Sequence, residues 1–117
     1  MARKLQNYLI SHRKRFGLTQ DETAFLLGIT EGSQVCRYES FRGVPSLKTA
    51  LTCQAVFGVP VAELFAGIYD QVEKETAKRA RALASKMDAA TASKAQKRKG
   101  DLLRAIALTP DINRENP

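Results

Sequence analysis

Residues 17–42 read GLTQDETAFLLGITEGSQVCRYESFR and predict two short helices joined by a tight turn. The first helix, expected over residues 20–27, follows Thr19, and Glu22 three residues later completes the pattern of a capping box. Gly28 can adopt the left-handed conformation that ends a helix. The second helix is expected over residues 33–40, with Thr30 or Ser33 as its cap. Its inward-facing side chains are expected to be Val35 and Tyr38.

Length and composition narrow the class of protein. The chain has 117 residues, enough for one modest domain and an extension, and a formal net charge of +7. A basic chain suits a polyanion, most simply nucleic acid, although a merely soluble basic protein has the same charge. Cys36 and Cys53 are expected to be reduced thiols of a cytoplasmic protein rather than a disulfide.

Helical patterns flank the two central helices, and no stretch shows the alternation of apolar and polar residues that is typical of a strand. We expect a first helix over residues 4–15, a fourth that starts after Ser46, and a short fifth over residues 61–65. The side chains expected on the apolar side of the fourth helix are Leu47, Ala50, Leu51, Cys53 and Phe57. The sequence therefore predicts an all-α domain of five helices over residues 1–67.

Residues 68–117 differ in composition and are expected to form a helical extension. A long helix over about residues 68–88 carries a thin apolar stripe, which should dock on the domain or pair with a partner chain. The stripe consists of Ile68, Val72, Leu83 and Met87. Residues 89–100 are expected to fray, as a flexible basic tail. Its run Lys97-Arg98-Lys99 would add only sequence-independent affinity for DNA. A short helix is expected after Asp101, and disorder after Pro110.

The runs RKRFGLTQDETAFLLGI, VCRYE and PSLKTALTCQAVFGVPVAELF occur in this order over about residues 4–66. They resemble the Cro and lambda-repressor type helix-turn-helix domain, often called Xre-like. The resemblance implies a five-helix domain that binds operator DNA, usually as a dimer, in a bacterial or phage-like, nucleoid-associated protein. One departure is a stretch from Gly28 to Val35 that is one residue longer than in the family, and Gly32 is expected in the extra step.

The resemblance implies that the helix over residues 33–40 enters the major groove. It directs Ser33 and Arg37 at base edges, where an arginine can bind guanine O6 and N7 with about 1–3 kcal/mol of discrimination. Gln34 could read adenine or could point at the sugar-phosphate backbone. Glu31 could accept from cytosine N4 or remain a solvated acid. The expected base-reading residues are therefore Ser33, Gln34 and Arg37.

Contacts to the DNA backbone are expected around the two central helices. In the family, the Gln that matches Gln20 binds a phosphate and braces the recognition helix. Thr19 and Arg42 flank the two helices and are further candidates. Arg15, with Lys14, could contact the backbone from the first helix or could form a solvated basic end. These candidates would fix the register of the protein on DNA.

An ion pair between Arg13 and Glu39 is implied by the same resemblance. The family pairs an Arg four residues before the glycine of GLTQ with the Glu that ends the recognition helix. The pair would tie the first helix to the third, and its role would be structural.

Other classes of function have weaker support in the sequence. An enzyme is not expected, because there is no phosphate-binding glycine loop, no paired Cys or His spacing for a metal, and no nucleophile with a base. No cofactor is expected, and His12 is interpreted as a surface residue. The alternative function is a protein-interaction module, such as the antitoxin of a toxin–antitoxin pair, with a partner bound through residues 68–88. RNA binding through the basic tail would lack the usual aromatic platforms.

The expected partners are double-stranded DNA and a second copy of the chain. Dimerisation is expected through the fifth helix and the long helix that follows it. No membrane is expected, because no apolar run approaches the ~20 residues that span a bilayer. The start of the sequence also lacks the apolar core of a signal peptide.

Overall fold

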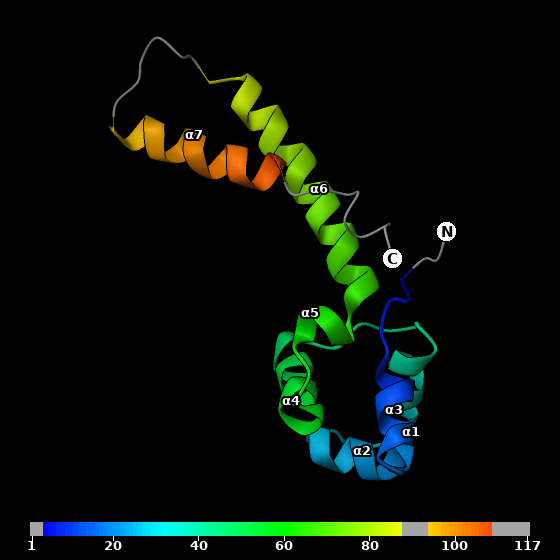
Figure 1. Ribbon diagram of the computed structural model, residues 1–117. Helices are drawn as coiled ribbons and strands as arrows, with labels where there is room; N and C mark the ends of the chain where they lie inside the picture. The colour runs from blue at the N-terminus through cyan, green and yellow to red at the C-terminus, as the bar shows by residue number, and fades with distance from the viewer. Residues whose placement is uncertain (1–3, 88–93, 109–117) are drawn as a thin grey trace. The chain divides into compact units, whose positions relative to one another are not determined.

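The computed structural model describes residues 4–87 and 94–108, which form α-helices and no strand. Within these ranges the predicted all-α class is confirmed (Figure 1). The helices are α1 (Leu9–Arg15), α2 (Gln20–Leu27), α3 (Gly32–Glu39), α4 (Leu47–Phe57), α5 (Val61–Leu64), α6 (Ala66–Ser85) and α7 (Lys94–Ala107). None of the described helices is long and apolar enough to cross a membrane.

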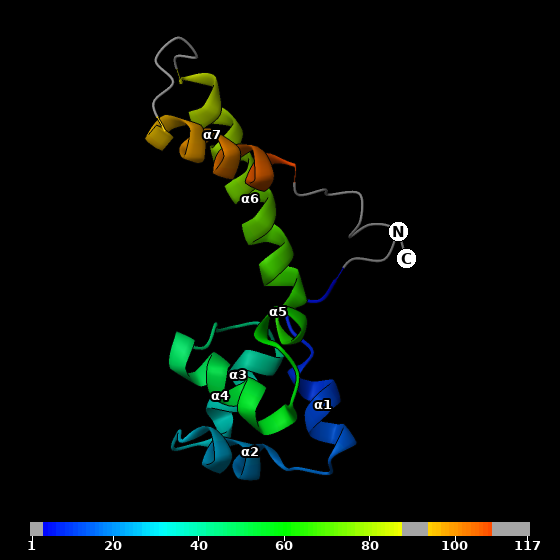
Figure 2. The ribbon, with the colours of Figure 1, turned by 60° about the vertical axis from the view of Figure 1, so that its left-hand side comes forward.

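The chain divides into two compact units, of which the first comprises residues 4–68. Helices α1–α5 of this unit surround one apolar core (Figure 2). Every one of these helices contributes a side chain that is at most 7% exposed, among them Leu9, Leu27, Val35, Tyr38, Cys53, Phe57 and Leu64. Burial raises the pKa of the Cys53 thiol to about 11.

Helix α2 has the predicted bounds and the predicted caps. The Thr19 hydroxyl accepts from the Glu22 backbone N–H at 3.0 Å, and the Glu22 carboxylate accepts from the Thr19 N–H at 2.8 Å. At the other end Gly28 has φ 73°, the left-handed conformation that favours glycine. The capping box and the glycine stop are therefore confirmed.

Helix α1 starts later than predicted, because residues 4–8 make their polar contacts elsewhere. The Asn7 side chain accepts from the Leu9 N–H at 3.1 Å and donates to the Tyr38 carbonyl at 2.8 Å. The Tyr8 N–H donates to the Leu64 carbonyl at 2.8 Å. These tertiary hydrogen bonds outweigh the local helical pattern of residues 4–8.

Helix α3 starts at Gly32, and neither Thr30 nor Ser33 is its cap. The Gly32 N–H instead donates to the Asp21 carboxylate of α2 at 3.1 Å. A Cβ at position 32 would clash with that carboxylate and would lie 3.0 Å from the Asp21 backbone nitrogen. Because α2 and α3 approach so closely here, position 32 suits only a glycine.

Helix α4 is capped as expected but buries fewer side chains than predicted. The Ser46 hydroxyl accepts from the Thr49 N–H at 3.2 Å, and Gly58 ends the helix with φ 68°. Leu47 and Leu51 were expected on the apolar side of α4 but are 74% and 50% exposed. They lie outside the arc of α4 that faces the core, which Ala50, Cys53 and Phe57 occupy.

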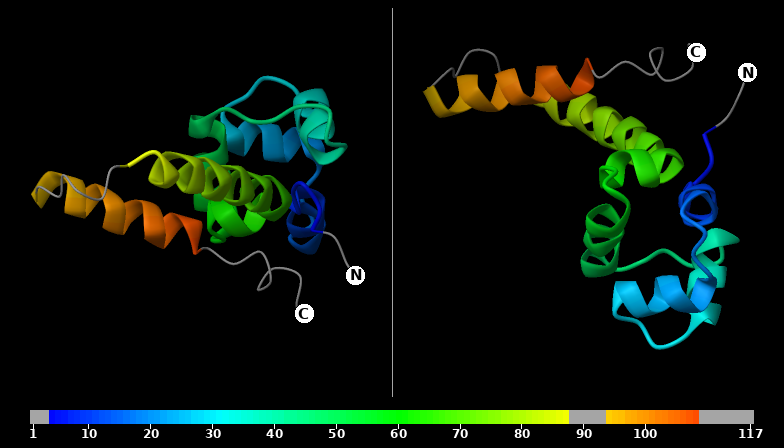
Figure 3. Two further views of the ribbon diagram at one scale, coloured as in Figure 1. Left: turned by 90° about the horizontal axis from the view of Figure 1, so that it is seen from above. Right: turned by 60° about the horizontal axis from the view of Figure 1, so that its bottom comes forward.

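The second unit contains α6 from Tyr69 onward and α7. The two helices run antiparallel, since Arg81 Nη1 donates to the Ala107 carbonyl at 3.2 Å while Met87 lies beside Gly100 (Figure 3). Ala77 and Ala80 of α6 and Leu103 of α7 are buried in this unit.

One prediction for the extension is wrong. Residues 94–100 are helical rather than frayed, because α7 starts at Lys94. Val72 and Leu83 of the predicted stripe are 50% and 49% exposed, so they do not dock within this chain, and their pairing with a partner chain stays a prediction. The expectations for residues 89–93 and 110–117 lie outside the described residues.

Candidate nucleic-acid interface

The outer face of α3 presents three polar side chains. Ser33, Gln34 and Arg37 are exposed, whereas Val35 and Tyr38 are 1% and 7% exposed on the opposite side. The inward orientation of Val35 and Tyr38 is therefore confirmed. The exposed face offers hydroxyl, amide and guanidinium groups, which are the donors and acceptors that read base edges.

Two of these three side chains hold contacts within the protein. The Arg37 guanidinium donates from Nη2 to the Arg42 carbonyl at 3.2 Å. The Ser33 hydroxyl donates to the Glu31 carboxylate at 3.1 Å, so Glu31 is placed against Ser33. A guanidinium has five N–H groups, so the contact with Arg42 leaves most of the Arg37 donors for another partner.

The start of α2 and the outer face of α3 border one open depression of about 720 Å³. The structure thus brings together the predicted backbone residues Thr19, Gln20 and Arg42 with Ser33 and Arg37. Arg15 does not line the depression and lies exposed at the end of α1. The residues that line the depression are Thr19, Gln20, Asp21, Gly32, Ser33, Cys36, Arg37 and Arg42.

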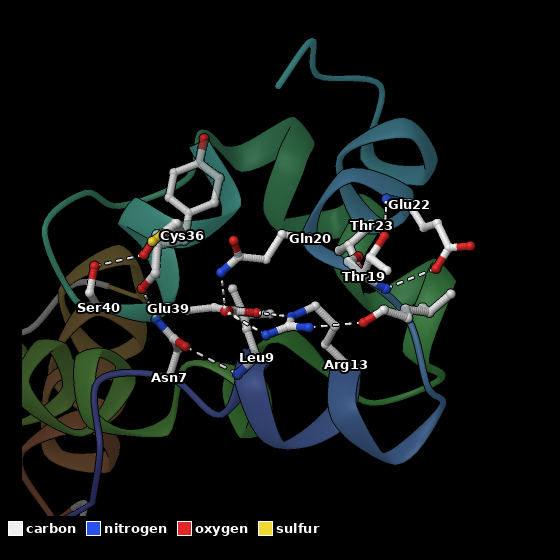
Figure 4. Close-up of polar contacts among 12 residues, drawn as sticks. Asn7, Leu9, Arg13, Thr19, Gln20, Glu22, Thr23, Cys36, Glu39 and Ser40 are labelled. Atoms are coloured by element: carbon white, nitrogen blue, oxygen red, sulfur yellow. Dashed lines mark hydrogen bonds and ion pairs between the residues drawn. The ribbon is translucent and has the colours of Figure 1, made fainter. Parts of the chain in front are cut away.

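Behind the exposed face, Glu39 joins three helices (Figure 4). Arg13 of α1 approaches its carboxylate with Nε at 2.5 Å and Nη2 at 3.1 Å, and Gln20 of α2 donates to it at 3.1 Å. The Arg13 and Glu39 side chains are 11% and 4% exposed. The hydrogen bond to Glu39 raises the pKa of Arg13 above its usual value. The expected pair is thus present, and Gln20 contacts the end of α3.

Asp21 and Asn7 position α3 and were not predicted from the sequence. Asp21 looks like any acidic residue in the first turn of a helix, and its role as the cap of α3 depends on how closely α2 and α3 approach. Asn7 is 2% exposed, although it lies in a segment with a helical pattern. A buried asparagine needs hydrogen-bond partners for its side-chain amide. That need was the one signal in the sequence that could have indicated the role of Asn7.

The remaining predictions for the site concern metal ligands, His12 and the two cysteines. Within the described residues, no group of His, Cys, Asp and Glu side chains could hold a metal ion. His12 is half-buried, with its ring 6.0 Å from that of Phe57, so it is not a fully exposed residue. Both cysteines are free.

Comparison with known proteins gives no independent assignment. No protein-family model, curated protein or solved structure matches this chain. The function is therefore argued from the residues of the site.

Proposed function

We propose that this chain is a sequence-specific, double-stranded DNA-binding transcriptional regulator with a five-helix, lambda-repressor-like helix-turn-helix domain. In this proposal α3 lies in the major groove of an operator. The observation that carries it is a polar face of three exposed side chains on a helix whose other side is anchored by buried contacts. A rigidly held helix with exposed polar side chains suits base readout, because the contacts of the helix within the protein fix the positions of those side chains.

Arg37 is the principal base-reading residue in this proposal. It exchanges its hydrogen bond to the Arg42 carbonyl for a bidentate contact with guanine O6 and N7. Gln34 and Ser33 supply the neighbouring contacts, with Gln34 suited to adenine. Both lie one or more turns from the packed end of α3, where Glu39 is held.

The DNA backbone is bound by groups around the depression. Thr19 and Gln20 at the start of α2 and Arg42 after α3 face phosphates on either side of the groove. Arg15 adds a cation from the end of α1. The α3 N-terminus itself is less suited to a phosphate, because the Asp21 carboxylate already accepts from its first N–H.

A homodimer completes the proposal. Three readers at about 1–3 kcal/mol each give too little discrimination for one site in a genome, whereas two half-sites one turn apart multiply it. The exposed Val72 of α6 supplies an apolar contact for a second copy. Light scattering of free and operator-bound protein tests this, with Val72→Glu expected to shift the assembly toward monomer. A monomer in both states would refute the dimer.

Selection of bound sites from a random pool of duplex DNA tests the function. We expect one preferred sequence with inverted half-sites. Arg37→Ala should then relax preference at one base pair per half-site, while Lys78→Ala, which removes an exposed cation of α6, should leave the base preference unchanged. The absence of any preferred sequence would refute the proposed function. Unchanged affinity and preference in Arg37→Ala would refute the assigned reading face.

A further inference from the structure

The positive charge of this chain is concentrated in residues 76–108, which comprise the second half of α6 and all of α7. Residues 76–108 contain nine Lys or Arg and two Asp, whereas the rest of the chain has ten Lys or Arg and ten Asp or Glu. The formal excess of +7 therefore resides entirely in this segment. The proposed reading domain is much closer to neutral, with seven Lys or Arg and five Asp or Glu over residues 4–68.

The cations gather where α6 ends and α7 starts. We call Lys86, Lys94, Lys97, Arg98 and Lys99 the basic tip, and all five are exposed. Met87 lies beside Gly100, since a Cβ at position 100 would be 3.8 Å from Met87 Cε, so the end of α6 meets the first half of α7. Among the described residues, none of the five cations is within ion-pair distance of a carboxylate.

Three members of the basic tip share one face of α7. At 3.6 residues per turn, Lys94, Lys97 and Arg98 fall within an arc of about 100°. This face is opposite Leu103, which is buried. The hairpin therefore fixes the direction in which these cations project, as a flexible tail could not.

The cations at the start of α7 destabilise this helix when no anion is bound. Lys94 and Arg98 are a like-charge pair four residues apart, and such pairs oppose helix formation. The first turn of α7 has no acidic residue, and cations at a helix N-terminus are repelled by the helix dipole. A bound polyanion would relieve both penalties, which is the expected signature of a surface built for an anionic partner.

The chemistry of the hairpin favours the phosphate backbone of a duplex. Residues 70–108 contain no aromatic side chain or histidine, so unpaired bases have nothing on which to stack. Leu103 is buried and Ile106 half-buried, and the exposed Leu102 and Leu108 lie about 120° apart by helical spacing, so α7 presents no continuous apolar face that could enter a bilayer. The five residues of the basic tip are exposed cations, which bind phosphates irrespective of sequence.

We propose that the basic tip of the α6–α7 hairpin is a second binding site for DNA, which holds the phosphate backbone of a duplex without regard to its sequence. This site does not depend on α3 reading bases. It gives the chain a separate, salt-sensitive contact that raises affinity equally for the operator and for other DNA.

The test compares two variants of the full chain that lose the same charge. In the tip variant Lys94→Gln, Lys97→Gln and Arg98→Gln are combined, and in the control Lys4→Gln, Lys48→Gln and Lys74→Gln are combined. Glutamine has nearly the helix propensity of lysine and arginine, and circular dichroism verifies that both variants stay folded. Fluorescence anisotropy measures binding to random-sequence duplex DNA, to random-sequence duplex RNA and to any selected operator, between about 50 and 200 mM salt.

We expect the tip variant to lower the slope of log affinity against log salt by up to about 2.7, which is about 0.9 for each of three lost phosphate contacts. The ratio of operator to random-DNA affinity should stay unchanged, and the control should lower the slope by less than one contact. Equal slopes in the tip variant and the control would overturn the proposal. It would also be overturned if the wild type preferred duplex RNA and the tip variant lost that preference. Failure to select any operator would refute the proposed function alone, because the random-DNA slopes are measured independently.

Discussion

Removal of Glu39 is the sharpest test of how the third helix is held. Glu39→Ala deletes a carboxylate that is 4% exposed and that accepts from Arg13 and Gln20. Arg13 would then keep only its hydrogen bond to the Leu18 carbonyl, at 2.9 Å, while its side chain stays 11% exposed. The variant therefore leaves a nearly buried cation without a counter-charge.

The size of the effect follows from that stranded charge. Breaking a buried ion pair by removal of one partner costs about 3–5 kcal/mol, because desolvation of the other partner is no longer compensated. In a domain of this length 1 kcal/mol lowers the melting temperature by about 4–8 °C, so Glu39→Ala should melt at least about 12 °C below the wild type. Arg13→Ala should cost a similar amount, since it leaves the carboxylate with Gln20 as its remaining partner.

Urea unfolding of the wild type, both single variants and the double variant measures the coupling. We expect the double variant to lose much less stability than the sum of the single losses, with a coupling energy well above the ~0–1 kcal/mol of surface pairs. The pair Asp101 and Arg104 of α7, whose side chains are 57% and 67% exposed, is the matched control. Additive losses for Arg13 and Glu39, or a coupling no larger than that of the control, would refute the reasoning.

Two further predictions concern single positions. Gly32→Ala should destabilise the domain by about 1–3 kcal/mol in urea unfolding, because the added Cβ meets the Asp21 backbone and carboxylate. The gain in helix propensity does not compensate for this clash. An unchanged or raised stability would contradict the close approach of α2 and α3. Burial raises the pKa of Cys53 from its ordinary 9.0 to about 11, so the thiol of the unfolded chain ionises first and stability should fall as pH rises from 9 to 11. Cys53→Ala should show a smaller fall over that range, and an equal fall in both proteins would exclude Cys53 as its cause.

Features set by neighbours in sequence could be predicted. The bounds of α2, its capping box and the glycine that ends it depend on residues within one or two turns, and the structure has them as expected. The inward positions Val35 and Tyr38 also follow from helical spacing alone.

Features set by distant contacts could not be predicted. The late start of α1 depends on Tyr38 and Leu64, and the cap of α3 depends on Asp21, eleven residues before Gly32. The hydrogen bond between Arg37 and the Arg42 carbonyl requires a loop conformation that no local pattern encodes. The helical first half of α7 was missed, because its basic sequence has no apolar periodicity and the buried Leu103 lies in the second half, where a short helix was expected.

The hydrogen bonds that hold α3 have a consequence for amide exchange. A helix of eight residues is too short to persist by itself in water. Its partners Asn7, Arg13, Gln20 and Asp21 all precede it in the chain and belong to other elements. The amides of α3 should therefore exchange with solvent only when the contacts to α1 and α2 open together. The proposed reading face would then be lost as one cooperative unit with the segment that starts at Asn7, rather than by fraying from its own ends.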